Sequence, residues 1–112
     1  MDKILVYQEK IKQILGSYIQ DVQKSNIEGE AYLISDDVTM HYLLYHNQWR
    51  AGHRIYGCIL HTRIKNDKVY VEYDGTDIGF ADSFADAGIP KSDIVLAFHT
   101  PAKRPHTGFA VA

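Results

Sequence analysis

Four polar side chains on two consecutive strand-like segments are the part of this sequence best suited to chemistry. They are His61, Arg63, Tyr70 and Glu72. Directly opposed residues of an antiparallel pair come within about 5.5 Å at Cβ, so His61 and Glu72 can face each other. A histidine oriented by a carboxylate is a typical general base. The four residues therefore form one candidate site.

A catalytic interpretation of this group needs a nucleophile or a polarising group beside the base. The sequence offers only Arg63 and Tyr70 nearby, whereas a cross-strand ion pair between His61 and Glu72 needs nothing further. The residues favour the ion pair. We predict no catalytic residue and expect the four side chains to form a wet, partly charged surface that a partner can bind.

A second candidate site is the cationic cluster near the C-terminus, which consists of His99, Lys103, Arg104 and His106. No Asp or Glu follows Asp93, and Pro101 and Pro105 stiffen the segment. In one interpretation the cluster is a rigid basic lip that contacts an acidic partner or a nucleic-acid phosphate. In the other it is a solvated loop whose charges balance the acidic residues of 69–90. The sequence leaves both interpretations open.

Metal and cofactor chemistry have little support in the sequence. The chain has six histidines but only one cysteine. A single cysteine excludes an internal disulfide and any paired-cysteine metal motif. His41 and His46 are five residues apart, so they fall on opposite faces of a strand. No His-x-x-x-His motif lies on a predicted helix. We predict no metal and no cofactor, and we expect Cys58 to be a small buried strand residue.

The elements that position these groups begin with a long amphipathic helix over residues 2–24. Its apolar stripe steps by seven, four, three and four residues through Ile4, Ile11, Leu15, Tyr18 and Val22. Such a stripe must be buried against another element. Strand-like segments rich in Tyr, Val and Ile follow at about 30–35, 39–48, 54–65 and 68–74. Their short connections predict an antiparallel meander.

The turn Asn66-Asp67 predicts a two-residue hairpin loop, because both residues tolerate positive φ. This loop fixes the register, in which Ile64 faces Val69 and Leu60 faces Tyr73. The predicted core face then contains Tyr56, Cys58, Leu60, Ile64, Val69, Val71 and Tyr73. The opposite face contains the four candidate site residues together with Ile55 and Ile59.

A second, shorter helix is predicted over residues 76–87, with Thr76 as its N-cap and Gly88 as the left-handed residue that ends it. The segment from Ile94 to Phe98 is extended and either adds a strand or crosses the sheet edge. The C-terminal residues are rich in Gly, Pro and apolar side chains up to Ala112. We expect them to be packed down on the domain, because exposing them would be costly.

Composition and charge indicate one α+β domain over residues 1–112. The net charge is −2, and the five acidic residues of 69–90 are interrupted by no Lys or Arg. This balance does not resemble the basic footprint of a DNA-binding protein, so we expect no strong direct DNA binding. The sequence has no signal-peptide pattern and no apolar run of about 20 residues, which predicts a cytoplasmic protein without membrane association.

Four motifs in this order resemble the XisI family, small cyanobacterial proteins named as controlling factors for excision of the fdxN DNA element. The motifs are G-C-I-L-H (57–61), D-G-T-D-I-G-F-A (74–81), G-I-P-K-S-D-I-V-L (88–96) and T-G-F-A-V-A (107–112). The sequence departs from the family pattern at Ala97, where Gly is expected, and at His106, where Tyr is expected. The resemblance spans most of the chain and is densest from Arg54 onward.

The resemblance implies an accessory role in DNA rearrangement during heterocyst differentiation, exerted by protein–protein contact. It also implies a companion, the nuclease-like protein XisH, and it transfers no catalytic residue. A homodimer is a further expectation, because apolar and tyrosine side chains occupy both predicted sheet faces. The alternative is a small enzyme or nuclease-related subunit that uses His61, Glu72 and the C-terminal basic segment.

Overall fold

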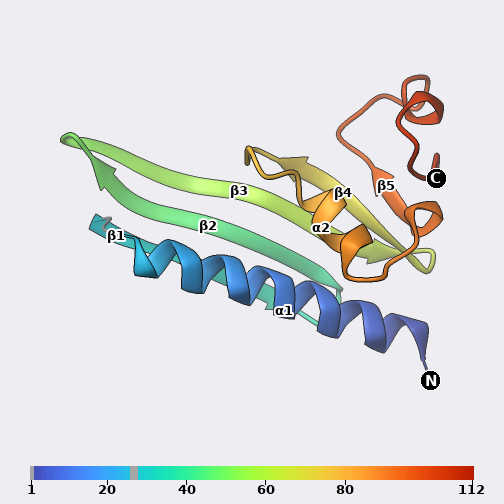
Figure 1. Cartoon of the computed structure of the whole chain (residues 1–112), viewed down its shortest axis with the longest axis horizontal. Coiled ribbons are helices and arrows are strands. Elements are labelled where there is room, and N and C mark those ends of the chain that lie inside the picture. Colours follow the sequence, from blue (N-terminus) through green and yellow to red (C-terminus); the bar gives the residue numbers. More distant parts are fainter. Residues whose placement is uncertain (1, 26–27) are drawn as a thin grey trace.

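The computed structural model describes residues 2–25 and 28–112 and places two helices on one side of a five-stranded sheet (Figure 1). The helices are α1 (Lys3–Lys24) and α2 (Phe80–Asp86), and two short 3₁₀ turns are η1 (Lys91–Asp93) and η2 (Arg104–His106). The strands are β1 (Glu28–Asp36), β2 (His41–Arg50), β3 (His53–Lys65), β4 (Lys68–Asp74) and β5 (Ile94–Leu96). The predicted α+β class is confirmed.

Helix α1 follows the predicted stripe and covers the sheet. Tyr7, Ile11 and Leu15 are buried against the strands, and the side chain of Asp2 caps the helix by accepting a hydrogen bond from the backbone N–H of Ile4. No helix of the described residues 2–25 and 28–112 has the length and apolar character needed to span a membrane.

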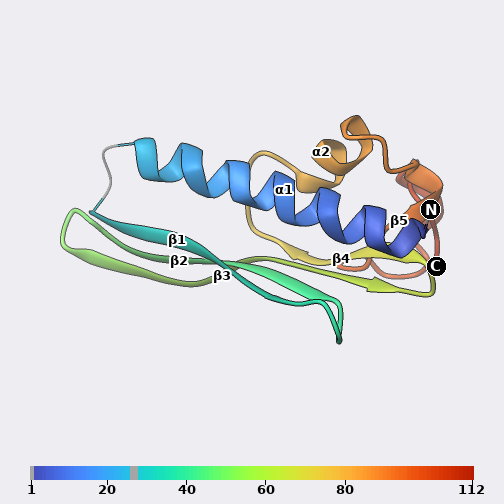
Figure 2. The ribbon, with the colours of Figure 1, turned by 90° about the horizontal axis from the view of Figure 1, so that it is seen from below.

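The sheet has the strand order β1-β2-β3-β4-β5, and Figure 2 shows α1 and α2 on the same side of it. The first four strands form the predicted antiparallel meander. The prediction of about four strands is one too few, because β5 pairs in parallel with β4. A parallel partner requires a crossover, which α2 supplies.

The hairpin between β3 and β4 confirms the predicted loop. Asn66 and Asp67 have φ values of 53° and 62°, as a two-residue turn of this kind requires. Ile64 then pairs with Val69 and is buried on the α1 side.

Two β-bulges change the register farther from that loop. In β4, Glu72 is an extra residue, because Thr62 pairs with Val71 while His61 pairs with Tyr73. The predicted pairing of His61 with Glu72 is therefore wrong. A bulge adds one residue to one strand and moves every following side chain to the other face.

The second bulge is in β3, where Leu60 pairs with Leu44 but Cys58 pairs with Tyr45, so that Ile59 is the extra residue. The two bulges together leave three side chains assigned to the core face outside it: Tyr56 and Tyr73 are exposed, and Cys58 is half-buried on the side away from α1. Ile55 and Ile59, assigned to the outer face, instead lie near Tyr18 of α1.

Helix α2 begins four residues later than predicted. Asp74 explains the delay, because its carboxylate accepts hydrogen bonds from the backbone N–H groups of Thr76 and Phe80, at 2.9 Å each. Thr76 therefore belongs to the preceding turn and is not the N-cap. The predicted end is confirmed: Gly88 has a φ of 104°, and the N–H of Ile89 donates to the carbonyl of Phe84.

The C-terminal segment, residues 97–112, folds back against β5. Ala110 pairs with Val95 as an isolated parallel bridge, and Phe109 packs against the core. The packed-down terminus is confirmed in this respect. Phe98 and Val111, however, remain 46% and 53% exposed.

Candidate functional site

The side of β1, β2 and β3 that faces away from α1 carries aromatic and aliphatic side chains. We call it the open face. In Figure 2 no helix or loop of the described chain lies against it. It consists of the outward residues Tyr32 and Ile34 of β1, Leu43, Tyr45 and Trp49 of β2, and Tyr56 and Cys58 of β3. Ile34, Trp49 and Tyr56 are 46%, 47% and 60% exposed. An apolar surface of this kind marks an interaction site.

Aromatic contacts order the centre of the open face. The Tyr32 and Tyr45 rings stack with their centroids 5.9 Å apart, and Tyr45 meets Tyr56 edge-on at 6.2 Å. The Tyr56 hydroxyl beside Tyr32 raises the pKa of the Tyr32 phenol. These rings are held by one another and present a rigid surface.

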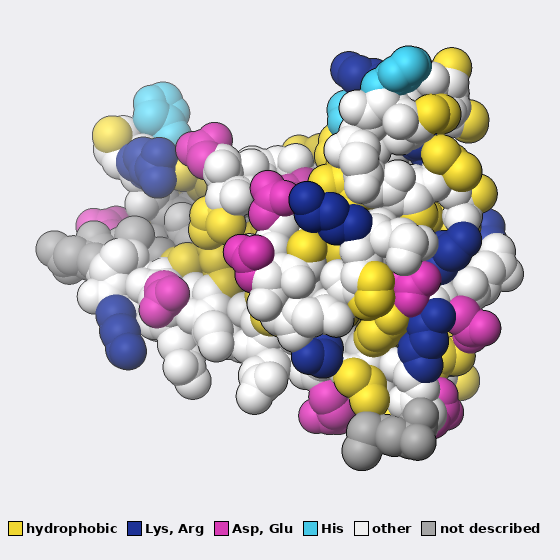
Figure 3. Space-filling view, turned by 45° about the vertical axis from the view of Figure 1, so that its right-hand side comes forward, with side chains coloured by type: hydrophobic (Ala, Val, Ile, Leu, Met, Phe, Trp, Pro, Cys, Tyr) yellow, Lys and Arg dark blue, Asp and Glu magenta, His cyan; other side chains and the backbone are white. Residues whose placement is uncertain are grey.

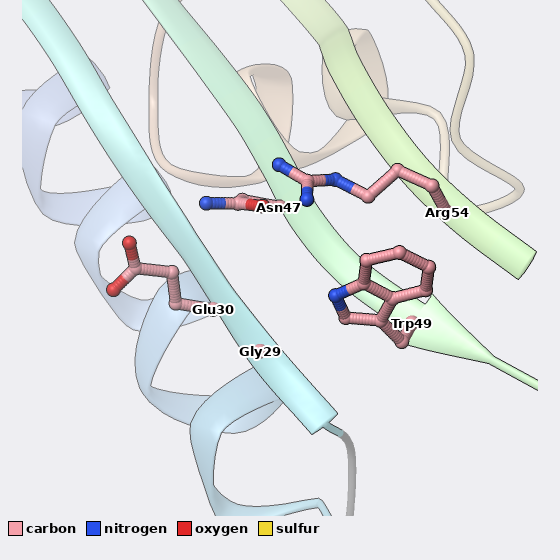
Figure 4. A pocket seen from close by; sticks show the side chains of 5 residues that line it. All are labelled: Gly29, Glu30, Asn47, Trp49 and Arg54. Atoms are coloured by element: carbon pink, nitrogen blue, oxygen red, sulfur yellow. The ribbon is translucent and has the colours of Figure 1, made fainter. Parts of the chain in front are cut away.

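A hollow of about 470 Å³ lies at one end of the open face (Figure 4). Figure 4 shows Glu30, Trp49 and Arg54 around it. The Arg54 guanidinium lies 5.3 Å from the Trp49 ring centroid and 5.2 Å from that of Tyr56. At the floor, Gly29 is required for space, because a Cβ there would lie 2.2 Å from the carbonyl oxygen of Asn47.

The four site residues predicted on β3 and β4 are arranged differently from the prediction. The bulge lets Glu72 pair with Arg63, whose Nε lies 2.8 Å from Oε2. His61 instead contacts His41 of β2, with 2.9 Å between Nε2 and Nδ1. Burial and the neighbouring His41 lower the pKa of His61. A base oriented by Glu72 is therefore not assembled here.

Tyr70 differs most from its predicted environment, because it is only 8% exposed. It pairs with Arg63 on one side and Val95 on the other, and Val95 is fully buried. The expectation of a wet surface is wrong at Tyr70, and the open face ends at β4. Its role as a partner contact stays a prediction, as do those of His61, Arg63 and Glu72.

The C-terminal cluster divides into an inward and an outward part. Arg104 points inward and donates to the carbonyl oxygens of His99 and Ala97, at 3.0 Å and 3.2 Å. The His99 ring lies 4.5 Å from that of Phe98. Lys103 and His106 are exposed. Figure 3 shows Lys, Arg and His side chains grouped at the tip of this segment, at the upper right.

His61 and the C-terminal cluster are held by different parts of the fold. His61 is on β3, whereas the C-terminal cluster follows β5, and β4 runs between them. At about 4.8 Å per strand, the backbones of β3 and β5 are roughly 10 Å apart. The cluster follows β5, two strands away from the strand that carries His61. The backbones of these two strands are too far apart for a hydrogen bond between them.

A second hollow, of about 400 Å³, opens between α1, the sheet and the turn before α2. Tyr18 and His46 meet there, with 3.1 Å between Oη and Nε2, and burial lowers the pKa of His46. Asp77 and Arg50 line the rim. The contact between Tyr18 and His46 connects α1 to β2.

Metal ligands are not gathered at either hollow: within residues 2–25 and 28–112, no three His, Cys, Asp or Glu side chains lie close enough together to hold an ion. Burial raises the pKa of the Cys58 thiol, which disfavours its reactive thiolate form.

Sequence reasoning missed the open face as a site. The signal was present in β1 and β2, where Tyr32 and Ile34 alternate with inward residues and pair with Tyr45 and Leu43. Charged residues on β3 and β4 give a stronger chemical signal in the sequence than these apolar ones do. The position of Arg54 opposite Trp49 depends on the bulge at Ile59, for which the sequence gives no local sign.

Comparison with known proteins agrees with this architecture. The XisI protein family model matches residues 1–111. The crystal structure of a XisI-like protein from Anabaena variabilis ATCC 29413 is 35% identical, with a TM-score of 0.85, over 97% of this chain and 99% of that one. The fdxN element excision controlling factor XisI from the same organism is 34% identical, with a TM-score of 0.81, over 99% and 100%. No curated protein matches. The chain belongs to the XisI family.

Proposed function

We propose that this chain is a cytoplasmic accessory factor in DNA rearrangement that acts by binding another protein. The similar structure from Anabaena variabilis is named as a controlling factor for excision of the fdxN element, and this supports a regulatory role. The partner we propose is a nuclease-like protein of the XisH type. The observation that carries the proposal is the C-terminal segment, a basic surface that the fold holds in place.

Several contacts support this segment as a preformed binding surface. Arg104 holds its backbone from the inside, and the N–H of Ala110 donates to the carbonyl of Ile94 at 2.8 Å. Lys103 and His106 are exposed on this segment, and so is Phe98, whose ring lies 4.5 Å from that of His99. A rigid surface that combines an aromatic ring with positive charge suits an acidic protein partner, because little entropy is lost on binding.

A non-catalytic role is part of the proposal. His61 is bonded to His41 and not to Glu72, and the C-terminal cluster follows a strand two places away. These positions give no support to an enzyme built on His61, Glu72 and the basic segment.

The proposal is tested by measuring the affinity of a purified XisH-type protein for the double variant Lys103→Glu/His106→Glu. We expect the dissociation constant to rise by roughly tenfold or more, which corresponds to about 1.4 kcal/mol. Lys24→Glu on the exposed end of α1 is the matched control and should bind normally. Unchanged binding of the double variant would overturn the proposed surface.

A further inference from the structure

The open face is charged at both ends in a self-complementary way. At one end, Glu28 of β1 pairs with Trp49 of β2, and Trp49 pairs with Arg54 of β3. At the other end the corresponding row is Asp36, His41 and Arg63. In both rows the acid is on β1 and the arginine is on β3, with the apolar centre between the rows.

This pattern fits a particular symmetric neighbour. We propose that a second copy of this chain covers the open face, related by a two-fold axis that runs along β2. The axis places β1 of each copy over β3 of the other, so that Glu28 faces Arg54 and Asp36 faces Arg63. Sheets that pack face to face keep their strands within about 30° of each other, which this arrangement allows.

The charges exclude the other face-to-face two-fold arrangement. An axis across the strands would place β1 over β1, so that Glu28 would face Asp36 of the second copy and like charges would repel. A two-fold interface uses the same patch on both copies, and a patch that carries both signs in register is what such an interface needs. An unrelated partner would not require the two signs to match across β2.

The apolar residues of β2 lie on the proposed axis. Leu43 and Tyr45 would each meet their own copies, and the Trp49 rings would meet beside the 470 Å³ hollow at that end of the face. Trp49 is the only tryptophan of the chain and is 47% exposed. It therefore reports directly on whether the face is covered. Arg63 is already held by Glu72, so the Glu28–Arg54 contact is the sharper one to test.

The test uses two single variants, Glu28→Arg and Arg54→Glu, studied alone and mixed. Wild-type protein should sediment as a dimer, and its Trp49 emission should shift to the red on dilution. Each variant alone places like charges in contact and should raise the dimer dissociation constant by roughly tenfold or more. An equimolar mixture restores both opposite-charge contacts and should form heterodimers with near-wild-type affinity.

The mixture also shows that both variants are folded, because an unfolded chain could not restore assembly. The variants Asp21→Arg and Lys24→Glu on the exposed side of α1 are the controls and should dimerise as the wild type does. A monomeric wild-type protein, unchanged dimerisation of the single variants, or a mixture that stays monomeric would each overturn the proposal. These outcomes do not involve Lys103 or His106, so they are independent of the partner-binding test.

Discussion

Arg104 is the side chain that holds the C-terminal segment in shape. Its guanidinium donates to the carbonyl oxygens of His99, Ala97 and Val111, which would otherwise have to be satisfied by water. A planar fork with several donors suits such a set of acceptors better than an ammonium group does. The sequence indicates a cluster of positive charges here but does not indicate which of them turns inward.

Replacing Arg104 by Lys should loosen this segment although the charge is kept. We expect a loss of about 1 to 2 kcal/mol in the free energy of unfolding, because hydrogen bonds to a charged group are lost. Hydrogen exchange should become faster for the amides of residues 97–111. Lys103→Ala, next to it but exposed, should change neither quantity. Equal exchange rates in the Arg104→Lys protein and the wild type would show that the guanidinium does not hold the segment.

The elements themselves were predictable wherever the deciding signal is local. The stripe of α1 and the turn Asn66-Asp67 are set by side chains within a few residues of each other, and both predictions are confirmed. The bulges at Ile59 and Glu72 could not be predicted locally, because the position of an extra residue is fixed by how two strands and their neighbours pack together. Each bulge reverses a face, which is why the His61 environment and the open face escaped prediction.

The contact between α1 and β2 should make the stability of the fold depend on pH. Burial, together with Arg50, lowers the pKa of His46 below its ordinary value of 6.5, and Tyr18 of α1 contacts its ring. As pH falls below 6.5, the unfolded chain takes up a proton that the folded chain resists. The free energy of unfolding therefore decreases as pH falls from about neutral toward the lower pKa of the folded state. Above neutral pH, His46 makes no pH-dependent contribution to stability.

Urea unfolding measured between about pH 7.5 and pH 5 tests this expectation. The variant His46→Gln cannot be protonated, so its decline should be smaller than that of the wild type. The pKa of His61 is also lowered, by burial and by His41, with Glu72 and Arg63 as its charged neighbours on β4 and β3. In the double variant His46→Gln/His61→Gln, the free energy of unfolding should therefore depend on pH even less. A decline of full size in His46→Gln would contradict the assignment.

At the scale of the whole molecule, the cations are largely engaged within the chain. Carboxylates hold three of them, in the pairs Lys3–Asp93, Lys12–Asp37 and Arg63–Glu72. Arg54 lies on aromatic rings, and Arg104 lies on backbone carbonyls. The net charge is −2, which a dimer would double, and within residues 2–25 and 28–112 the cations engaged in this way are not free to form an extended positive surface. Proteins that grip DNA need such a surface to displace the counterions of the phosphates.

We therefore expect the isolated protein to bind a labelled DNA duplex weakly or not at all in fluorescence anisotropy at physiological salt. Any binding at low salt should depend shallowly on salt, because few phosphates can be neutralised. The end of the β2–β3 hairpin carries Arg50, His53 and Arg54 within five residues and is the hairpin tip most suited to contact a phosphate. Tight binding with a steep salt dependence, lost in Arg50→Glu, would show that this hairpin grips DNA. The protein would then contact the DNA itself as well as a partner.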